Sequence, residues 1–265
     1  MNNAQILDLK LDNITIQASC RSKIGSLVGE MAASTIKNVH ASKIYLKGGY
    51  GTGGLVGRIA ASDNSSIDRS STENGIVDSK CSGGSASNVG GLIGGIFGPT
   101  TISESFSTLD VESNYNSTGG LIGGISNPEV SIFNSYASGS VESNLNNKGG
   151  FVGYLGANNT IVNSFSIGRV KTSGGSNIGG LIGKDNSPTS NSVQNSYWDL
   201  SKSDRTNSDG GIGRTSDQLV KSLTAGATIG GAHTYTGWDF VNVWDAGSAC
   251  DYPRLRWQNE PLKVS

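Results

Sequence analysis

Apolar and polar residues alternate with a period of two along the first part of the chain. Leu7, Leu9 and Leu11 are separated by single polar residues, and Ile14 and Ile16 continue the pattern. Alternation of this kind predicts a β-strand with one buried face, because successive side chains point to opposite sides of a strand. Residues 4–199 show no sustained three-and-four spacing of apolar residues, which an amphipathic helix would require. The pattern therefore predicts an all-β fold for this region.

A short glycine-rich motif recurs at nearly constant intervals. It reads Gly-Gly-Leu-Ile-Gly at residues 90–94, and its central position recurs at intervals of 28, 37, 29, 30 and 30 residues. The central residues are Leu27, Leu55, Leu92, Leu121, Phe151 and Leu181. A second column lies between these motifs and consists of Ile6, Ile36, Ile67, Ile102, Ile132, Ile161 and Val193. A fixed period of about 30 residues predicts a solenoid in which each repeat forms one rung.

The two columns define seven repeat units between about residue 4 and residue 199. Each unit contains two or three short β-like runs that are separated by Gly, Asn and Ser turns. We therefore predict a right-handed parallel β-helix of about seven rungs, with the central Leu residues pointing inward. Paired glycines at the motif allow a tight corner or a close approach of neighbouring backbones. The third unit is longer, and we place an insertion within residues 59–88.

The period stops after Asp199, and the remaining residues differ in composition. Residues 215–223 predict a short helix with Thr215 or Ser216 as its N-cap. Three of the four tryptophans lie at positions 238, 244 and 257. We assign residues 1–199 to the β-helix and 200–265 to a C-terminal cap, because a terminal rung must be covered. An aromatic ligand pocket in this segment is the alternative.

Charge and cysteine content limit the classes of function that the chain could have. The chain has 20 basic and 21 acidic residues and shows no basic patch, which argues against nucleic-acid or anionic-membrane partners. No apolar run is long enough for membrane insertion. Cys20, Cys81 and Cys250 share no position relative to the glycine motifs. We interpret them as structural or incidental residues rather than as a disulfide framework or a metal site.

The repeated Gly-Leu-hydrophobic-Gly motif and the Asn-Ser-aromatic element at 134–136, 163–165 and 195–197 resemble the GLUG-repeat family. The resemblance covers most of the chain, although Ser26 and Phe151 depart from the motif. GLUG repeats occur in large bacterial surface and secreted proteins, including filamentous-haemagglutinin-like adhesins and immunoglobulin A-cleaving peptidases. The resemblance implies a secreted or cell-surface location, and we expect further domains in a larger parent protein.

An aromatic column is the first candidate site. It has one ring in each of four successive units and consists of Phe106, Tyr136, Phe165 and Tyr197. Facing outward, these rings would suit the apolar face of a sugar; facing inward or along a groove, they would stabilise the stack. The equivalent residues in earlier units, Lys10, His40 and Ser71, are polar, which favours an outward or edge position.

Two polar columns are further candidates. Asp78, Glu112, Glu142 and Lys171 occupy one position in consecutive units, and Glu112 with Glu142 could hold Ca²⁺. The alternative is a solvated face. Asn134, Asn163 and Asn195, with Asn38 earlier, form a column whose amides could hydrogen-bond along the axis.

No catalytic motif stands out. The sequence lacks His-Glu-x-x-His, and its two histidines, His40 and His233, lie far apart. We therefore predict a rigid, non-catalytic adhesin module that binds host or environmental glycans or surface proteins and needs no cofactor. A polysaccharide-degrading β-helix enzyme and a spacer of a large secreted peptidase are the alternatives.

Overall fold

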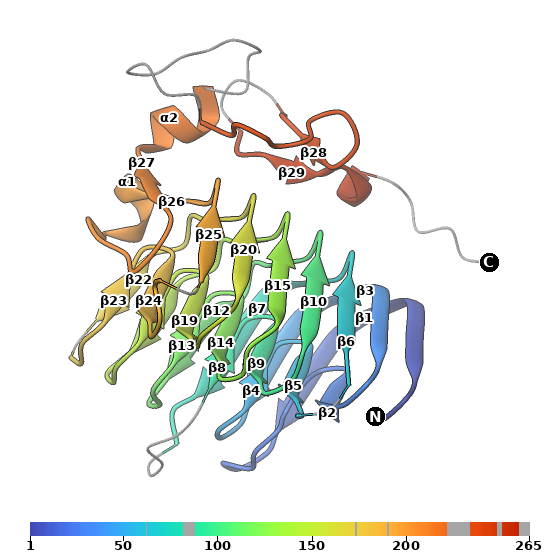
Figure 1. The fold of residues 1–265 in the computed structure, drawn as a ribbon. Helices are drawn as coiled ribbons and strands as arrows, with labels where there is room; N and C mark the ends of the chain where they lie inside the picture. The colour runs from blue at the N-terminus through green and yellow to red at the C-terminus, as the bar shows by residue number, and fades with distance from the viewer. Residues whose placement is uncertain are drawn as a thin grey trace.

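The computed structural model is a parallel β-helix whose rungs stack along one axis (Figure 1). It describes residues 1–61, 63–81, 88–172, 174–189, 191–221, 234–247 and 251–259. Equivalent strands of successive rungs pair in parallel, with Ile102 opposite both Ile67 and Ile132. The prediction of an all-β solenoid of about seven rungs is therefore confirmed.

The strands fall into five columns. The first column begins with two long strands that bend through three columns, and the later rungs use separate short strands. It consists of β1 (Gln5–Gln17), β3 (Thr35–Lys47), β6 (Ser65–Asp68), β10 (Thr100–Ser103), β15 (Val130–Phe133), β20 (Thr160–Val162) and β25 (Ser192–Gln194).

The second and third columns continue from the same long strands. The second adds β7 (Ser71–Ser79), β11 (Phe106–Ser107), β16 (Tyr136–Ala137), β21 (Phe165–Ser166), β26 (Tyr197–Asp199) and β27 (Ile212–Arg214). The third pairs the end of β7 with β12 (Asp110–Ser113), β17 (Val141–Ser143) and β22 (Val170–Thr172).

The glycine motif joins the fourth column to the fifth. The fourth comprises β4 (Thr52–Gly53), β8 (Val89–Gly90), β13 (Thr118–Gly119), β18 (Lys148–Gly149) and β23 (Ile178–Gly179). The fifth comprises β2 (Val28–Met31), β5 (Val56–Ile59), β9 (Ile93–Ile96), β14 (Ile122–Ile125), β19 (Val152–Leu155) and β24 (Ile182–Asp185). A full rung thus contains five short strands, more than the two or three expected, because the chain bends every few residues.

The interior is filled by the residues that the repeat predicted. Leu55, Leu92, Leu121, Phe151 and Leu181 are completely buried. The paired glycines permit this packing because neighbouring backbones come close. A Cβ atom added to Gly90 would lie 2.1 Å from the Ile93 carbonyl oxygen, and one added to Gly91 would lie 2.1 Å from the Gly120 carbonyl oxygen. Only a residue without a side chain fits at these two positions.

The Asn-Ser-aromatic element forms the corner between the first and second columns. Asn134 adopts a left-handed backbone conformation with φ of 49°, which asparagine tolerates better than most residues. The next residue, Ser135, is buried, and its hydroxyl donates to the Phe133 carbonyl while accepting from the Ser105 amide. Serines at this position form a buried ladder made of Ser70, Ser105, Ser135, Ser164 and Ser196.

The described residues after Asp199 form a capping loop, a short helix and a C-terminal segment. Residues 200–214, which we call the capping loop, include α1 (Leu200–Ser203) and β27 and lie over the last rung. The Ser208 hydroxyl there accepts hydrogen bonds from the amides of Leu181 and Ile182. The predicted short helix is present as α2 (Ser216–Lys221), with reciprocal hydrogen bonds between Thr215 and Gln218 at its start.

The last of these, which we call the C-terminal segment, comprises the described residues 234–247 and 251–259. It contains β28 (Trp244–Asp245), β29 (Arg254–Leu255) and the 3₁₀ helix η1 (Arg256–Asn259). Figure 1 shows it running back along the side of the solenoid across several rungs. It therefore covers a lateral face, whereas the capping loop covers the end.

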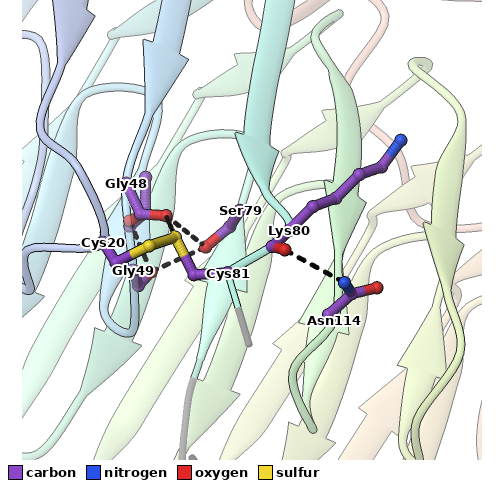
Figure 2. The surroundings of a disulfide bond; sticks show 8 residues. Cys20, Gly48, Gly49, Ser79, Lys80, Cys81 and Asn114 are labelled. Atoms are coloured by element: carbon purple, nitrogen blue, oxygen red, sulfur yellow. Dashed lines mark hydrogen bonds between the residues drawn. A yellow bond between two sulfur atoms is a disulfide. The ribbon is translucent and has the colours of Figure 1, made fainter. Parts of the chain in front are cut away.

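A disulfide bond joins Cys20 to Cys81 (Figure 2). Our interpretation of the cysteines is wrong for this pair, and Cys250 lies outside the described residues. Strand register explains the error. Gln17, Lys47 and Asp78 share one position on successive rungs, and Cys20 and Cys81 each lie three residues beyond it, past the ends of β1 and β7, with their Cα atoms 5.6 Å apart. Counting from the glycine motifs hid this equivalence, because the third unit is longer than the first.

Candidate functional site

The aromatic column is stacked as its spacing predicts. Phe106 pairs with Tyr136, Tyr136 with Phe165, and Phe165 with Tyr197 in strand register. The rings of Phe106 and Tyr136 are nearly parallel, with centroids 4.6 Å apart, and those of Tyr136 and Phe165 are 5.0 Å apart. All four side chains are nonetheless buried, with exposed fractions of 6% or less.

Tryptophans of the C-terminal segment shield the four rings of the aromatic column from solvent. Trp257 contacts Phe106, Trp244 contacts Tyr136 and Phe165, and Trp238 contacts Phe165 and Tyr197, at centroid distances between 5.6 and 6.4 Å. Burial raises the pKa of the Tyr136 hydroxyl, which accepts a hydrogen bond from Gln258. The column therefore lies in a second hydrophobic core rather than on an open strip.

Each tryptophan also bonds to the corner beside its ring partner. The indole N–H of Trp257 donates to the Glu104 carbonyl at 2.9 Å, and that of Trp244 donates to Asn134 Oδ1 at 3.4 Å. Trp238 donates to the Asn195 carbonyl at 2.9 Å. Apolar rings and indole donors thus fix the C-terminal segment in one register along the solenoid. The tryptophans predicted as a cap or a ligand pocket are packed against the solenoid's own side chains.

His40 occupies the aromatic position in the second rung. Its ring lies 4.6 Å from that of Trp257, its Nδ1 lies 3.0 Å from Ser71 Oγ, and its Nε2 lies 3.0 Å from Asn38 Oδ1. Burial, assisted by the positive charge of Lys10, lowers the pKa of His40 to about 4. The second histidine, His233, lies outside the described residues.

The charged column has the predicted register. Glu112 lies opposite Asp78 on one side and Glu142 on the other, and Glu142 lies opposite Lys171. Each glutamate has a cationic partner, since Lys80 contacts Glu112 and Lys171 Nζ lies 3.6 Å from Glu142 Oε2. In the described part of the chain, no three His, Cys, Asp or Glu side chains form a metal-binding group. The lysines supply the positive charge that the hypothesis assigned to Ca²⁺.

The predicted asparagine column makes different hydrogen bonds from those expected. Asn38 donates to Asp8 along the axis, but Asn134 and Asn163 bond to Trp244 and Gly237 of the C-terminal segment. Asparagine ladders are present instead at the turn after the third column. Asn144 donates to Asn114 at 3.3 Å, and Asn177 donates to Asn147 at 2.8 Å.

A buried lysine was missed by sequence reasoning. Lys148 aligns with Thr118 and Ile178, and it is completely buried. Its ammonium group donates to the carbonyl oxygens of Ser143, Leu145 and Gly174, so it links the turns of two rungs. Burial lowers its pKa. The sequence signal that could have identified Lys148 is its repeat position, which Thr118 occupies in the preceding rung. The Thr118 hydroxyl also donates a hydrogen bond to a turn carbonyl.

Comparison with known proteins supports the architecture. No family model and no curated protein sequence matches the chain. Among solved structures, it is similar to "a putative immunoglobulin A1 protease from Bacteroides ovatus", with a TM-score of 0.64 and 19% sequence identity. The match covers 94% of this chain and 75% of the other chain. At this identity the similarity shows the fold alone. Within the described residues, no helix combines the length and apolarity needed to cross a membrane.

Proposed function

We propose that this chain is a rigid, non-catalytic β-helical module of a secreted or cell-surface bacterial adhesin, and that it presents its exposed faces to glycan or protein ligands. The main observation in support of this proposal is the continuous strand register from β1 to β25, which repeats each outward position once per rung. Equivalent residues then lie about 4.8 Å apart along the axis. A surface with this regularity suits a repetitive or extended ligand.

The Cys20–Cys81 disulfide supports the proposed location. Disulfides form and persist in secreted and surface proteins, whereas cytosolic reductants keep most thiols reduced. The resemblance of the repeat to GLUG proteins of bacterial surfaces points the same way. Further domains of a larger parent protein are part of the proposal.

The burial of the aromatic column moves the proposed ligand surface elsewhere. Two lateral faces carry exposed or half-exposed polar residues, including Thr101 on the first column and Glu142 on the third. The aromatic face is occupied by the C-terminal segment, so we do not place a ligand there.

A glycan array and a panel of host surface proteins test the proposal. The wild-type chain is compared with Thr101→Arg and Glu142→Arg, which alter two different faces. We expect binding to one ligand class and its loss in one variant only, with unchanged thermal unfolding. Failure to bind any ligand would contradict the adhesin function.

A spacer within a large secreted peptidase is the second candidate. The specific observation in its favour is that tryptophans of the C-terminal segment cover the four rings of the aromatic column. The protease name of the structural neighbour belongs to that protein, and we transfer no catalytic residue from it. Absence of ligand binding together with retained stability would favour this spacer function.

Calcium binding at Glu112 and Glu142 is tested by titration. Because Lys80 and Lys171 already contact these carboxylates, we expect added Ca²⁺ to leave the melting temperature unchanged. A saturable increase that is lost in Glu142→Gln would restore the calcium hypothesis.

A further inference from the structure

Three polar side chains that lie over the fifth column accept or donate no hydrogen bond within the described part of the chain. They are Arg58 on β5, Asn88 just before β8, and Tyr154 on β19, and each is partly exposed. By contrast, the outward amide of Asn144 bonds to that of Asn114 in the neighbouring rung. The fifth column therefore carries hydrogen-bonding groups that the fold itself does not use.

The guanidinium of Arg58 is held in place but keeps its donors. Its Cζ lies 4.3 Å from the centroid of the Phe97 ring, and its Nε lies 3.5 Å from Glu30 Oε2. Stacking on a ring fixes the plane of a guanidinium, and its paired N–H groups can bind a carboxylate through two hydrogen bonds. Lys23 Nζ lies 2.8 Å from the same Glu30 oxygen, so two cations face one carboxylate. This end of the surface therefore attracts an anion.

Glycines at two outward positions make room for the Asn88 side chain. Strand pairing sets Gly95 opposite both Arg58 and Gly124. Gly124 in turn lies opposite Tyr154. A Cβ atom added to Gly95 would lie 2.7 Å from Asn88 Nδ2, and one added to Gly124 would lie 2.5 Å from Asn88 Oδ1. The amide of Asn88 thus lies over the two glycine rungs that separate Arg58 from Tyr154.

We propose that Arg58, Asn88 and Tyr154 form a binding site for an acidic oligosaccharide that lies along the solenoid axis. A sugar carboxylate binds the guanidinium of Arg58, and sugar hydroxyls exchange hydrogen bonds with the Asn88 amide. The ring of Tyr154 packs on the apolar face of a further sugar. Arg58 and Tyr154 are three rungs apart, so the site spans about 14 Å, which fits an oligosaccharide rather than a single sugar.

The place of Asn88 in the chain supports this assignment. Asn88 ends the segment 59–88, in which we placed the insertion of the longer third unit. Insertions in one repeat of a solenoid often lie on its binding face. The site uses a different column from Thr101 and Glu142, which test the adhesin proposal. Either proposal can therefore fail without the other.

Calorimetric titration of the full chain with a tetramer of galacturonic acid tests the site, and a neutral galactose tetramer is the control ligand. We expect saturable binding of the acidic tetramer alone. Affinity should fall about tenfold or more in Arg58→Gln, because the paired hydrogen bonds to the carboxylate are lost. Glu142→Arg adds positive charge on the third column and should leave the affinity unchanged. Equal binding of both tetramers, no binding of either, or unchanged affinity in Arg58→Gln would overturn the proposal.

Two further variants test the role of the amide. Asn88→Ala removes it, and Gly124→Ala places a methyl group 2.5 Å from Asn88 Oδ1, so that the flexible side chain must move away. We expect weaker binding of the acidic tetramer in both variants. Thermal unfolding of Asn88→Ala should match the wild type, because the amide bonds to no described residue. Wild-type affinity in both variants would show that Asn88 takes no part, and the site as proposed would be wrong.

Discussion

At the scale of single residues, the serine ladder explains why the Asn-Ser-aromatic element recurs. Asparagine accepts the left-handed corner, serine turns inward, and the aromatic ring turns outward. The inward hydroxyl is needed because the corner leaves an amide of the neighbouring rung without a strand partner. Ser135 accepts from the Ser105 amide at 3.2 Å and is itself completely buried. The repeat therefore encodes hydrogen bonding as well as apolar packing.

We predict that Ser135→Ala destabilises the fold by about 1–3 kcal/mol, because the buried Ser105 amide loses its acceptor. Ser131→Ala is the matched control; Ser131 lies on the neighbouring strand and is half-exposed, so we expect less than about 0.5 kcal/mol. Chemical denaturation measures both values. Equal effects of the two substitutions would show that the ladder contributes little.

The lowered pKa of His40 predicts acid sensitivity of the C-terminal segment. The folded value is about 4 and the ordinary value is 6.5, so the unfolded or undocked state binds the proton more readily. The contribution of His40 to stability is therefore fully present above pH 6.5 and is lost as the pH falls toward 4. Trp257 packs on this ring, and tryptophan fluorescence should report the change. His40→Gln should show a flatter profile, and an identical profile would contradict the assignment.

At the scale of elements, the solenoid and the C-terminal segment form two cores that share one wall. The inner core contains the repeat's Leu, Ile and Val residues. The outer core consists of Phe106, Tyr136, Phe165, Tyr197, Leu219, Tyr235, Trp238, Trp244 and Leu255. Outward aromatic rings are tolerated on the solenoid because another part of the chain removes them from water.

We predict that Trp244→Ala releases the C-terminal segment while the rungs stay folded. Trp244 is completely buried, and its ring lies 4.5 Å from that of Trp238. Truncation of a buried tryptophan costs about 3–5 kcal/mol, which is enough to populate local opening. Hydrogen exchange should rise in 234–247 and 251–259 and remain slow in the interior strands. Val241→Ala is the control, since Val241 is 79% exposed. Loss of protection throughout the chain would mean that the two cores unfold as one unit.

The sequence predicts the inner core well, because the solenoid repeats local patterns. Leu121 and its equivalents were placed inside by spacing alone, and the column of Phe106 was placed correctly in register. The outer core follows from contacts between residues far apart in the chain, such as Trp257 with Glu104, for which the repeat gives no signal. The Cys20–Cys81 pair was missed because motif spacing and strand register diverge in the third unit. Lys148 was missed because it breaks the composition of its column.

At the scale of the whole molecule, a solenoid in which each rung touches only its neighbours would be expected to fray from its ends. Two long-range links oppose this here. The C-terminal segment reaches from Tyr197 in the last rung to His40 in the second, through Trp238, Trp244 and Trp257. The disulfide joins the first rung to the third across the middle rung, where Ser79 Oγ donates to the Gly48 and Gly49 carbonyls. The two links overlap at the second and third rungs, so every rung lies within the span of at least one of them.

The first rung depends on the disulfide, because the C-terminal segment does not reach it through the ring contacts that bind the other rungs. A closed loop with a sequence separation of 61 residues gives a loop-entropy contribution of about 4 kcal/mol. We predict that the Cys20→Ser, Cys81→Ser double variant loses roughly this stability, with faster hydrogen exchange confined to β1, β2 and the start of β3. Cys250→Ser alone should leave exchange unchanged. If the double variant instead exchanges faster along the whole axis, the disulfide stabilises the fold globally, and the rungs behave as one cooperative unit rather than as a chain of neighbours.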